Sequence, residues 1–311
     1  MISAPTKSTV QLEVFELESG EHKYQALAIN LVEPRDLIKV SEMEILEIPP
    51  ELDLQREIIL YGIAPNWLYS HLVLRFRNAI WVGCFNAPLN AVVVVSSHIR
   101  QFQPGDVIPI DNNKSPGLAI LICGVPNSGK STLSYELRRS LPGLKDGTSI
   151  FLHRANWDGE GNHTLENPDT DLAKTLKNGS KRKIHEHPDA DKLLPEYFAY
   201  HGKAVENIRK VVDLALVDVG GKEDAVKKPV IDQCSHYIII SKCPEKIQEW
   251  HNLCSDKLKP IAVIHSVLEE KLEVLRTEPY LEIVAGKWEK SVKIPDVLLN
   301  EILKVLYSNS K

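Results

Sequence analysis

The segment with the clearest chemical meaning runs from Gly124 to Ser131 and reads Gly-Val-Pro-Asn-Ser-Gly-Lys-Ser. This is the G-x-x-x-x-G-K-S spacing of a phosphate-binding loop, or P-loop. Its two glycines let the backbone curl so that successive N–H groups point at phosphate oxygens. The lysine reaches the β- and γ-phosphates, and the next serine hydroxyl ligates Mg²⁺. We therefore predict a site for ATP and Mg²⁺ built from the following residues: Gly124, Asn127, Ser128, Gly129, Lys130, Ser131 and Thr132.

A second set of candidates is Asp218-Val219-Gly220-Gly221, which ends the apolar run 214–217. An apolar strand that ends in aspartate is typical of the Walker B element, whose carboxylate orders the Mg²⁺ shell. The D-x-x-G form of this segment brings a glycine N–H to the γ-phosphate. Because the segment follows the P-loop by about 90 residues, we predict that Asp218 and Ser131 hold the metal. Gly220 and Gly221 are predicted to contact the nucleotide.

Arg154 and Asp158 form a third set, in a polar segment that follows the predicted strand 149–153. Ligands of open α/β sheets bind beyond the carboxyl ends of the strands, so both side chains are expected to face the nucleotide or a second substrate. Arg154 is predicted to hold a phosphate, and Asp158 to ligate a metal or accept a proton. An ordinary polar loop is the alternative, because turns collect the same residue types.

The elements that position these residues are predicted from the hydrophobic pattern. The helix after the P-loop has Leu133, Leu137 and Leu141 on one face. Alternating strands and helices predict an α/β domain with a doubly wound parallel sheet. Its strands are expected at 118–122, 149–153, 214–218, 236–241 and 260–266, with 281–284 as an edge strand, and its later helices at 195–212, 244–256 and 295–307.

Residues 1–110 are predicted to form a separate small α+β domain, joined by a linker at 111–117 to a nucleotide-binding domain at 118–311. In the predicted helix of this first domain, Leu68, Leu72 and Phe76 make an apolar stripe. Its strands are expected at 10–14, 24–31, 57–63, 80–85 and 91–95, with a short helix between residues 34 and 50.

Four short stretches of the first domain resemble a known family. They are Gly62-x-x-Pro65-x-Trp67-Leu68, then Trp81-Val82, then Leu89-x-Ala91-Val92-Val93-Val94-x-Ser96-x-His98, and Gly105-Asp106-Val107-Ile108. They are similar to the small CRISPR-associated ring nucleases of type III systems, closely over 50–110 and loosely over 1–50. The resemblance implies Mn²⁺-dependent cleavage of cyclic tetra-adenylate by subunits that form a homo-oligomer, a dimer or a tetramer, around the ring. Members fused to a C-terminal P-loop domain also occur.

Two positions depart from the family pattern. Where the family has a histidine near the end of the helix and an aspartate after the next strand, this chain has Asn78 and Asn86. Asparagine cannot act as a general base and is a weak ligand for a hard cation. His71 and His98 are the remaining candidates, and His98 matches the Ser-His element of the family. A packed histidine is the alternative for His71. The resemblance therefore implies that the domain binds the ring and cleaves it slowly or not at all.

The composition sets outer limits. The 311 residues are 43% hydrophobic and carry a net charge of −5, which argues against duplex DNA as a partner. No apolar run reaches the roughly 20 residues of a membrane span, and the N-terminus lacks the apolar core of a signal peptide. The five cysteines show no zinc spacing. We therefore expect a cytoplasmic protein with reduced thiols.

Three functions fit these observations. The first is a type III CRISPR accessory protein that binds and degrades cyclic oligoadenylate through its N-terminal domain and binds and hydrolyses ATP through its C-terminal domain. The second is a P-loop kinase that phosphorylates a nucleotide or an RNA 5′-hydroxyl, with the N-terminal domain as a non-catalytic sensor. The third is a nucleotide-gated sensor without catalysis, in which binding shifts assembly.

Overall fold

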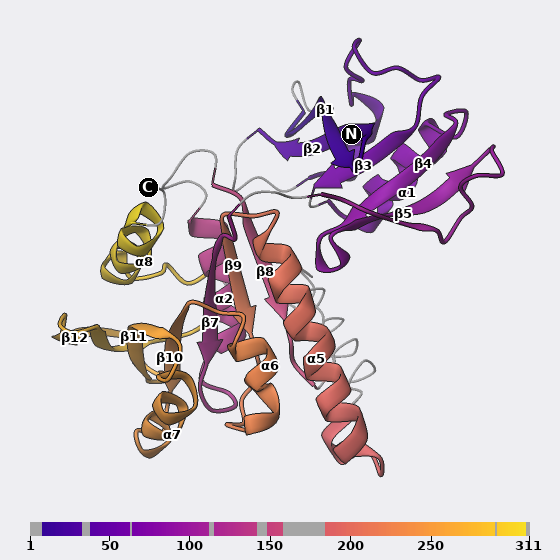
Figure 1. Cartoon of the computed structure of the whole chain (residues 1–311). Helices are drawn as coiled ribbons and strands as arrows, with labels where there is room; N and C mark the ends of the chain where they lie inside the picture. The colour runs from indigo at the N-terminus through magenta and orange to yellow at the C-terminus, as the bar shows by residue number, and fades with distance from the viewer. Residues whose placement is uncertain are drawn as a thin grey trace. The chain divides into compact units, whose positions relative to one another are not determined.

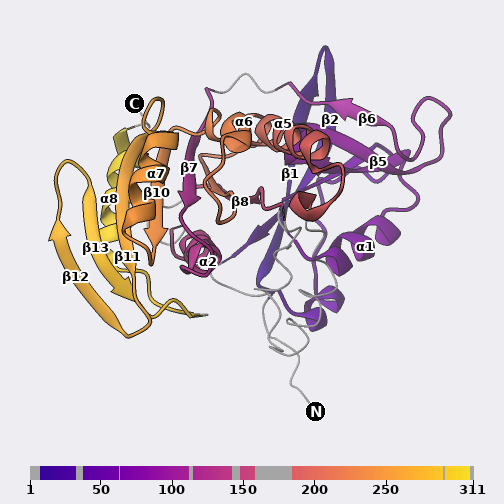
Figure 2. The ribbon, with the colours of Figure 1, turned by 90° about the horizontal axis from the view of Figure 1, so that it is seen from below.

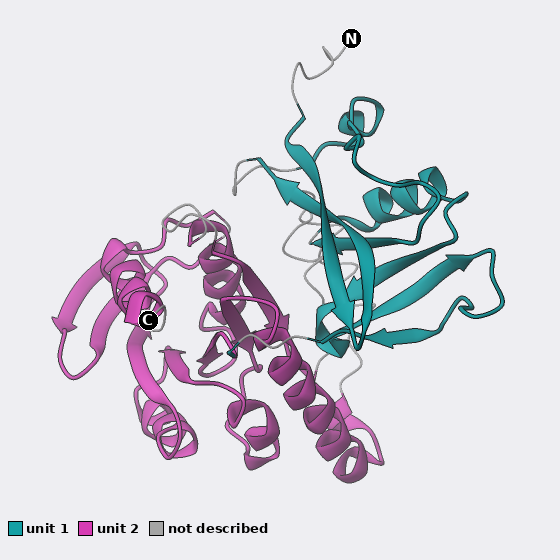
Figure 3. Cartoon of the chain, turned by 45° about the horizontal axis from the view of Figure 1, so that its top comes forward, with its two compact units in different colours: residues 1–115 teal, residues 116–311 magenta. Residues whose placement is uncertain are grey.

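The computed structural model describes residues 8–32, 38–62, 64–111, 115–141, 148–157, 184–289 and 291–308 (Figure 1). The chain divides into two compact units, unit 1 over Met1–Ser115 and unit 2 over Pro116–Lys311 (Figure 3). The division falls inside the polar stretch 111–117. Among the described residues, no helix is both long enough and apolar enough to cross a bilayer.

Unit 1 is an α+β fold on a mixed sheet. Its strands are β1 (Val10–Ser19), β2 (His22–Leu31), β3 (Ile58–Gly62), β4 (Trp81–Asn86), β5 (Ala91–Ser97) and β6 (Val107–Pro109), and they lie side by side in chain order. Its helices are η1 (Val40–Glu44), α1 (Asn66–Arg75) and η2 (Ala87–Leu89). Strands β2, β3 and β4 run parallel, whereas β1–β2, β4–β5 and β5–β6 pair antiparallel.

Helix α1 connects the parallel strands β3 and β4 and carries the predicted apolar stripe. Leu68, Leu72 and Phe76 are at most 3% exposed and pack in one core with residues of β2 and β3. Full burial of each such side chain contributes about 1.5–3 kcal/mol. The predicted helix and the five predicted strands of this unit are confirmed.

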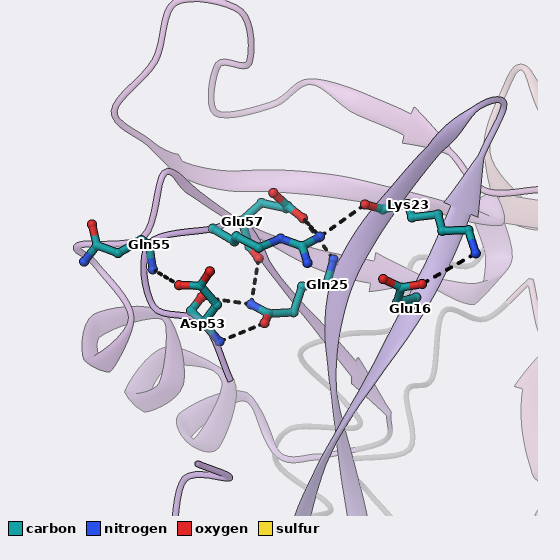
Figure 4. Close-up of polar contacts among 7 residues, drawn as sticks. Glu16, Lys23, Gln25, Asp53, Gln55 and Glu57 are labelled. Atoms are coloured by element: carbon teal, nitrogen blue, oxygen red, sulfur yellow. Dashed lines mark hydrogen bonds and ion pairs between the residues drawn. The ribbon is translucent and has the colours of Figure 1, made fainter. Parts of the chain in front are cut away.

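Gln25, a buried polar residue on β2, attaches the segment before β3 to the sheet (Figure 4). Its amide nitrogen donates to the carbonyl oxygens of Asp53 at 3.0 Å and Glu57 at 3.2 Å. Its amide oxygen accepts from the Asp53 N–H at 2.8 Å, and the Glu57 carboxylate accepts from the Gln25 N–H at 3.0 Å. These bonds satisfy a side chain that would otherwise be costly to bury.

Unit 2 is an α/β fold on a seven-stranded sheet with the order β12-β13-β11-β10-β7-β9-β8. All neighbouring strands are parallel except β12, which is antiparallel to β13. The strands are β7 (Leu118–Cys123), β8 (Ile150–Arg154), β9 (Leu214–Asp218), β10 (His236–Ser241), β11 (Lys259–Ser266), β12 (Lys271–Arg276) and β13 (Leu281–Gly286). The chain leaves β7 in one direction for β8 and β9 and later returns on its other side for β10, which makes the sheet doubly wound.

Helices cover both faces of this sheet. Helices α2 (Lys130–Ser140) and α8 (Asp296–Ser308) share one apolar core with the strands. Helix α5 (Ala190–Arg209) packs on β9 and on the short helix α6 (Lys228–Ile231), on the face away from α2 (Figure 2). Helix α7 (Glu245–Cys254) packs on β10, and two single turns, η3 (Ile184–Glu186) and η4 (Ala225–Lys227), complete the described elements.

Two predictions for unit 2 need correction. The strand expected at the edge, now β13, lies inside the sheet between β11 and β12. The strand at that edge is β12, which was not predicted. Its apolar and charged residues alternate over only Lys271–Val274, and all six of its residues are exposed, so it contributes no side chain to the core. Helix α5 begins at Ala190 and not at Pro195, which lies inside it. Pro195 is the sixth residue of the helix, where a proline removes one hydrogen bond to the preceding turn and its ring crowds the carbonyl of Asp191, so the first turn forms in spite of this cost.

Candidate functional site

The loop between β7 and α2 has the backbone shape that the P-loop spacing predicts. Gly124 has φ 131° and Gly129 has φ 91°, values that L-residues with a side chain rarely adopt. A Cβ atom on Gly124 would lie 1.9 Å from the carbonyl oxygen of Ile240 on β10. A Cβ on Gly129 would lie 2.6 Å from the Cβ of Trp288. Asn127 is also left-handed, with φ 58°. The loop is therefore closely packed, and glycine is required at both positions.

The lysine and the first serine of the loop are enclosed. Lys130 is 7% exposed, and its Nζ donates to the Val125 carbonyl oxygen of its own loop at 2.7 Å. Burial lowers the pKa of this ammonium, and the nearby Asp218 carboxylate opposes that shift. Ser128 is 2% exposed, and its Oγ accepts from the Lys242 N–H at 3.3 Å, which ties the loop to the segment after β10.

Three chemically active side chains meet beside this loop because of the strand register. Asp218 at the end of β9 pairs with Ile122 of β7 on one side and with Arg154 of β8 on the other. Ser131 Oγ donates to Asp218 Oδ2 at 2.9 Å. Arg154 Nη2 donates to Ser131 Oγ at 3.1 Å, and Arg154 Nε lies 3.6 Å from Asp218 Oδ2. The parallel strands β7, β9 and β8 thus deliver all three groups to one edge (Figure 1).

The two glycines after Asp218 pack against the same corner. The Gly220 N–H donates to Asp218 Oδ1 at 3.3 Å, and Gly220 has φ 75°. A Cβ on Gly221 would lie 2.6 Å from the backbone nitrogen of Pro126, so this loop rests directly on the P-loop. Thr132 lies in the first turn of α2 and is half-buried. Asp158, the remaining candidate near this corner, lies outside the described residues.

The donor set suits a Mg²⁺ nucleotide. A serine hydroxyl and a carboxylate oxygen are hard ligands, and Mg²⁺ takes its other positions from phosphates and water. Within the described ranges, no group of three or more His, Cys, Asp or Glu side chains could hold a metal without such help. The buried lysine and the curled loop match a triphosphate in charge and shape. The corner can therefore hold Mg²⁺ through Ser131 and Asp218 while the loop holds the phosphates.

A buried lysine near this corner was not predicted. Lys227 is 0% exposed, its Nζ donates to the Lys222 carbonyl oxygen, and it lies 4.4 Å from the ring centre of Trp157 and 5.4 Å from that of Trp250. Burial, followed by repulsion from Lys130, lowers its pKa to about 8. The sequence carries no signal for this arrangement, because a single lysine in a polar stretch normally indicates solvent exposure.

A histidine pair lies on the other side of β8. His153 Nε2 is 2.9 Å from His201 Nδ1 of α5. Burial lowers the pKa of His153 to about 3, helped by His201, and burial lowers the pKa of His201 to about 4. Both rings are therefore neutral at physiological pH, and one donates to the other.

The site residues predicted for unit 1 do not gather in one place. Asn78 lies in an exposed turn before β4. Asn86 is the last residue of β4, about 17 Å along the strand from its first residue, Trp81. Asn86 Oδ1 accepts from the Leu89 N–H at 3.1 Å and so caps η2. His98 follows β5, and its Nε2 is 2.6 Å from the Arg77 carbonyl oxygen, at the same end of β4 as Asn78. His71 is half-buried on α1, and its Nε2 finds no hydrogen-bond partner within the described ranges.

Unit 1 also has an open cavity of about 580 Å³ between the start of β1 and the segment after η1. It contains none of the four predicted residues. Apolar side chains such as Val10, Leu12 and Ile48 line it together with Glu47 and Glu51. Two carboxylates would repel an anionic ring, so this cavity does not suit a cyclic adenylate.

Sequence comparison supports a CRISPR connection for the N-terminal region. A family model described as CRISPR-associated protein (Cas_csx3) matches residues 31–109. A protein of Aquifex aeolicus (strain VF5), named only as an uncharacterized protein, is 41% identical over 51 residues, which are 16% of this chain and 46% of that protein. The chain thus spans less than half the length of this relative.

Structure comparison finds distant matches, each of which covers about two thirds of this chain. A plasmid partition protein of Borrelia burgdorferi B31 bound to AMPPNP has a TM-score of 0.41 and 10% identity, over 63% of this chain and 100% of that one. A thymidylate kinase of Ehrlichia chaffeensis has a TM-score of 0.29 and 14% identity, over 62% of this chain and 100% of that one. A DUF1611 family protein of Anabaena variabilis has a TM-score of 0.29 and 11% identity, over 67% of each chain. The fold class given above rests on the strand order and pairing of this chain, because these scores are low.

Proposed function

We propose that unit 2 binds Mg²⁺·ATP and hydrolyses it, and that unit 1 binds cyclic tetra-adenylate in a type III CRISPR response. The observation that carries the first part is the contact between Ser131 and Asp218 beside a glycine-shaped loop. The observation that carries the second part is the match of residues 31–109 to a CRISPR-associated family.

In unit 2, each group has a defined task. Lys130 exchanges the Val125 carbonyl oxygen for β- and γ-phosphate oxygens, which are stronger, charged acceptors. Ser131 and Asp218 would hold Mg²⁺, which would neutralise charge that develops on the phosphates. The Gly220 N–H lies next to Asp218, where it can donate to the terminal phosphate. Water attacks that phosphate, the bond to the bridging oxygen breaks, and ADP and inorganic phosphate leave.

In unit 1, the predicted site residues favour binding of cyclic tetra-adenylate over its rapid cleavage. Asn78 and Asn86 cannot take a proton, and His98 Nε2 is 2.6 Å from the Arg77 carbonyl oxygen, with no ion pair to a carboxylate among the described residues. The resemblance to ring nucleases implies Mn²⁺ as the metal and a homo-oligomer, a dimer or a tetramer, around the ring. A second copy would bring the two ends of β4 to one ligand, which a single unit does not do.

The deciding experiment measures turnover of labelled ATP by the whole chain, with and without cyclic tetra-adenylate. We expect Mg²⁺-dependent release of phosphate that changes when the ring is added. Asp218→Asn should fold normally, lose most of this turnover and retain ring binding. Absence of turnover in the unchanged chain together with nucleotide binding would favour a non-catalytic sensor.

A kinase is the second candidate, and the position of Arg154 favours it. This side chain is only 6% exposed and reaches Ser131 from the end of β8, where a second substrate would meet the terminal phosphate. Arginine is suited to bind an acceptor phosphate bidentately. Labelled phosphate found on an RNA 5′-end or a nucleotide, in place of free phosphate, would identify this activity.

A further inference from the structure

The Arg154 guanidinium lies against both oxygens that Mg²⁺ would use. It donates to Ser131 Oγ at 3.1 Å and lies 3.6 Å from Asp218 Oδ2. Ser131 Oγ in turn donates to the same Asp218 Oδ2 at 2.9 Å. The two charged side chains are almost fully enclosed, with Arg154 6% and Asp218 2% exposed. The positive charge of Arg154 therefore lies beside Ser131 and Asp218, the two proposed ligands of Mg²⁺.

Arg154 and Mg²⁺ would be two positive charges beside the same hydroxyl and carboxylate, so they compete through charge. A serine hydroxyl has one proton and two acceptor lone pairs. Ser131 gives its proton to Asp218 and one lone pair to Arg154. Mg²⁺ binds oxygen at about 2.0–2.1 Å, so a cation held by Ser131 Oγ would lie at most about 5 Å from Arg154 Nη2, which is 3.1 Å from the same oxygen. Two positive charges that close repel strongly in an enclosed site.

We infer that Arg154 is an internal counter-ion that leaves Ser131 and Asp218 when Mg²⁺ binds and moves to the terminal phosphate of the nucleotide. This inference rests on the proposed ATP site. Before the metal arrives, Arg154 keeps a buried carboxylate paired, which would otherwise be costly. Its place at the end of β8, level with Asp218, keeps it next to the phosphates after the exchange.

This exchange couples the metal to the nucleotide. Mg²⁺ without nucleotide has to displace a buried arginine from the Asp218 carboxylate without supplying a phosphate in exchange, so the metal alone binds weakly. Mg²⁺ with ATP supplies a phosphate as the new partner of the arginine. Removal of the Arg154 charge should therefore strengthen metal binding and weaken recognition of the terminal phosphate, two changes of opposite sign.

The test is Arg154→Gln in the whole chain, with Arg139→Gln as the matched control. Arg139 is on α2, 35% exposed, and pairs with Glu136 at 3.4 Å, so its loss removes the same charge from the same unit. Calorimetry gives the Mg²⁺ affinity at saturating ADP and the affinities for ADP and a non-hydrolysable ATP analogue in excess Mg²⁺. In Arg154→Gln we expect Mg²⁺ to bind about tenfold tighter and the preference for the analogue over ADP to fall about tenfold.

The outcomes are separable. A chain that binds no Mg²⁺·ADP contradicts the proposed function itself. A chain that binds Mg²⁺·ADP, but whose Mg²⁺ affinity stays the same or falls in Arg154→Gln, overturns the counter-ion role. If Arg154→Gln does not fold, phenylglyoxal labelling of the unchanged chain with detection by mass spectrometry replaces it. We expect Arg154 to be labelled faster with Mg²⁺·ADP than with EDTA alone, and equal labelling would overturn the inference.

Discussion

The nucleotide corner of unit 2 and the predicted adenylate residues of unit 1 differ in how the fold places them. Ser131, Asp218 and Arg154 come from three segments of the chain and lie within 3.6 Å of one another, largely buried. Asn86 and His98 come from consecutive strands and lie at opposite ends of β4, both exposed.

The cause is the direction of the strands. Strands β7, β9 and β8 are parallel, so the residues that follow them emerge at one edge of the sheet. Strands β4 and β5 are antiparallel, so the residues that follow them emerge at opposite edges. A parallel sheet can thus build a site from strand ends within one chain. The β4–β5 hairpin would need a second copy of the chain to bring residues from both of its ends to one ligand. The four predictions below test this difference, from the largest expected effect to the smallest.

The first prediction concerns the chemistry of unit 1. Asn78→His together with Asn86→Asp should raise the Mn²⁺-dependent cleavage of cyclic tetra-adenylate by about 10²–10⁴-fold, the usual contribution of a titratable base. The carboxylate is also the better ligand for Mn²⁺. Aspartate is as good an N-cap as asparagine, so η2 should survive. The measurement is single-turnover cleavage by the whole chain at saturating Mn²⁺.

The control for this experiment is Asn30→His with Asn252→Asp, which makes the same changes at two exposed asparagines far from β4 in the sequence. Its cleavage rate should equal that of the unchanged chain. Fast cleavage by the unchanged chain would show that His71 or His98 suffices.

The second prediction concerns the backbone of unit 2. Gly124→Ala forces a Cβ to within 1.9 Å of the Ile240 carbonyl oxygen and should abolish measurable ATP binding. We expect a loss of about 4 kcal/mol in the local stability of β7 and β10, the upper range for single substitutions. Peptide-resolved hydrogen exchange locates this loss. Gly20→Ala is the control: its φ is 59° but nothing lies within 4 Å, so it should cost about 1–2 kcal/mol and leave ATP binding intact.

The third prediction concerns a single charge. Lys130→Ala removes a charge-assisted contact to phosphate, worth about 1.5–3 kcal/mol, and should weaken ATP binding tenfold or more. Binding of cyclic tetra-adenylate should stay the same, because the proposed ring site lies in unit 1. Calorimetry with each ligand decides, and unchanged ATP affinity would exclude this loop as the nucleotide site.

The fourth prediction concerns pH. The pKa values of His153 and His201 fall from 6.5 to about 3 and about 4, so the folded state binds fewer protons than the unfolded state below pH 6.5. Stability is therefore highest above pH 6.5 and decreases as the pH falls toward 4. At pH 5.5 we expect a loss of about 3 kcal/mol around β8 and α5, about 1.4 kcal/mol from each histidine. Hydrogen exchange corrected for the intrinsic rate should show this loss there and not in β3 or β4.

Much of the fold is readable from the sequence because the information is local. The P-loop glycines follow an apolar run and precede a leucine stripe, so strand, loop and helix are predicted together, and each is confirmed. Asp218 is found in the same way, at the end of an apolar run. These segments form as predicted because a few neighbouring residues determine their hydrogen bonding and burial.

Only the tertiary structure decided which of these segments meet. The order β8-β9-β7, which places Arg154 on Asp218, depends on packing between strands that are far apart in the sequence. Lys227 is buried because two distant tryptophan rings enclose it, and β12 joins the sheet because β13 offers a free side. The sequence by itself determined the phosphate loop, its serine, its lysine and the acidic strand end. The fold added the contact of a buried Arg154 with the two predicted metal ligands, because long-range contacts combine residues that no local pattern connects.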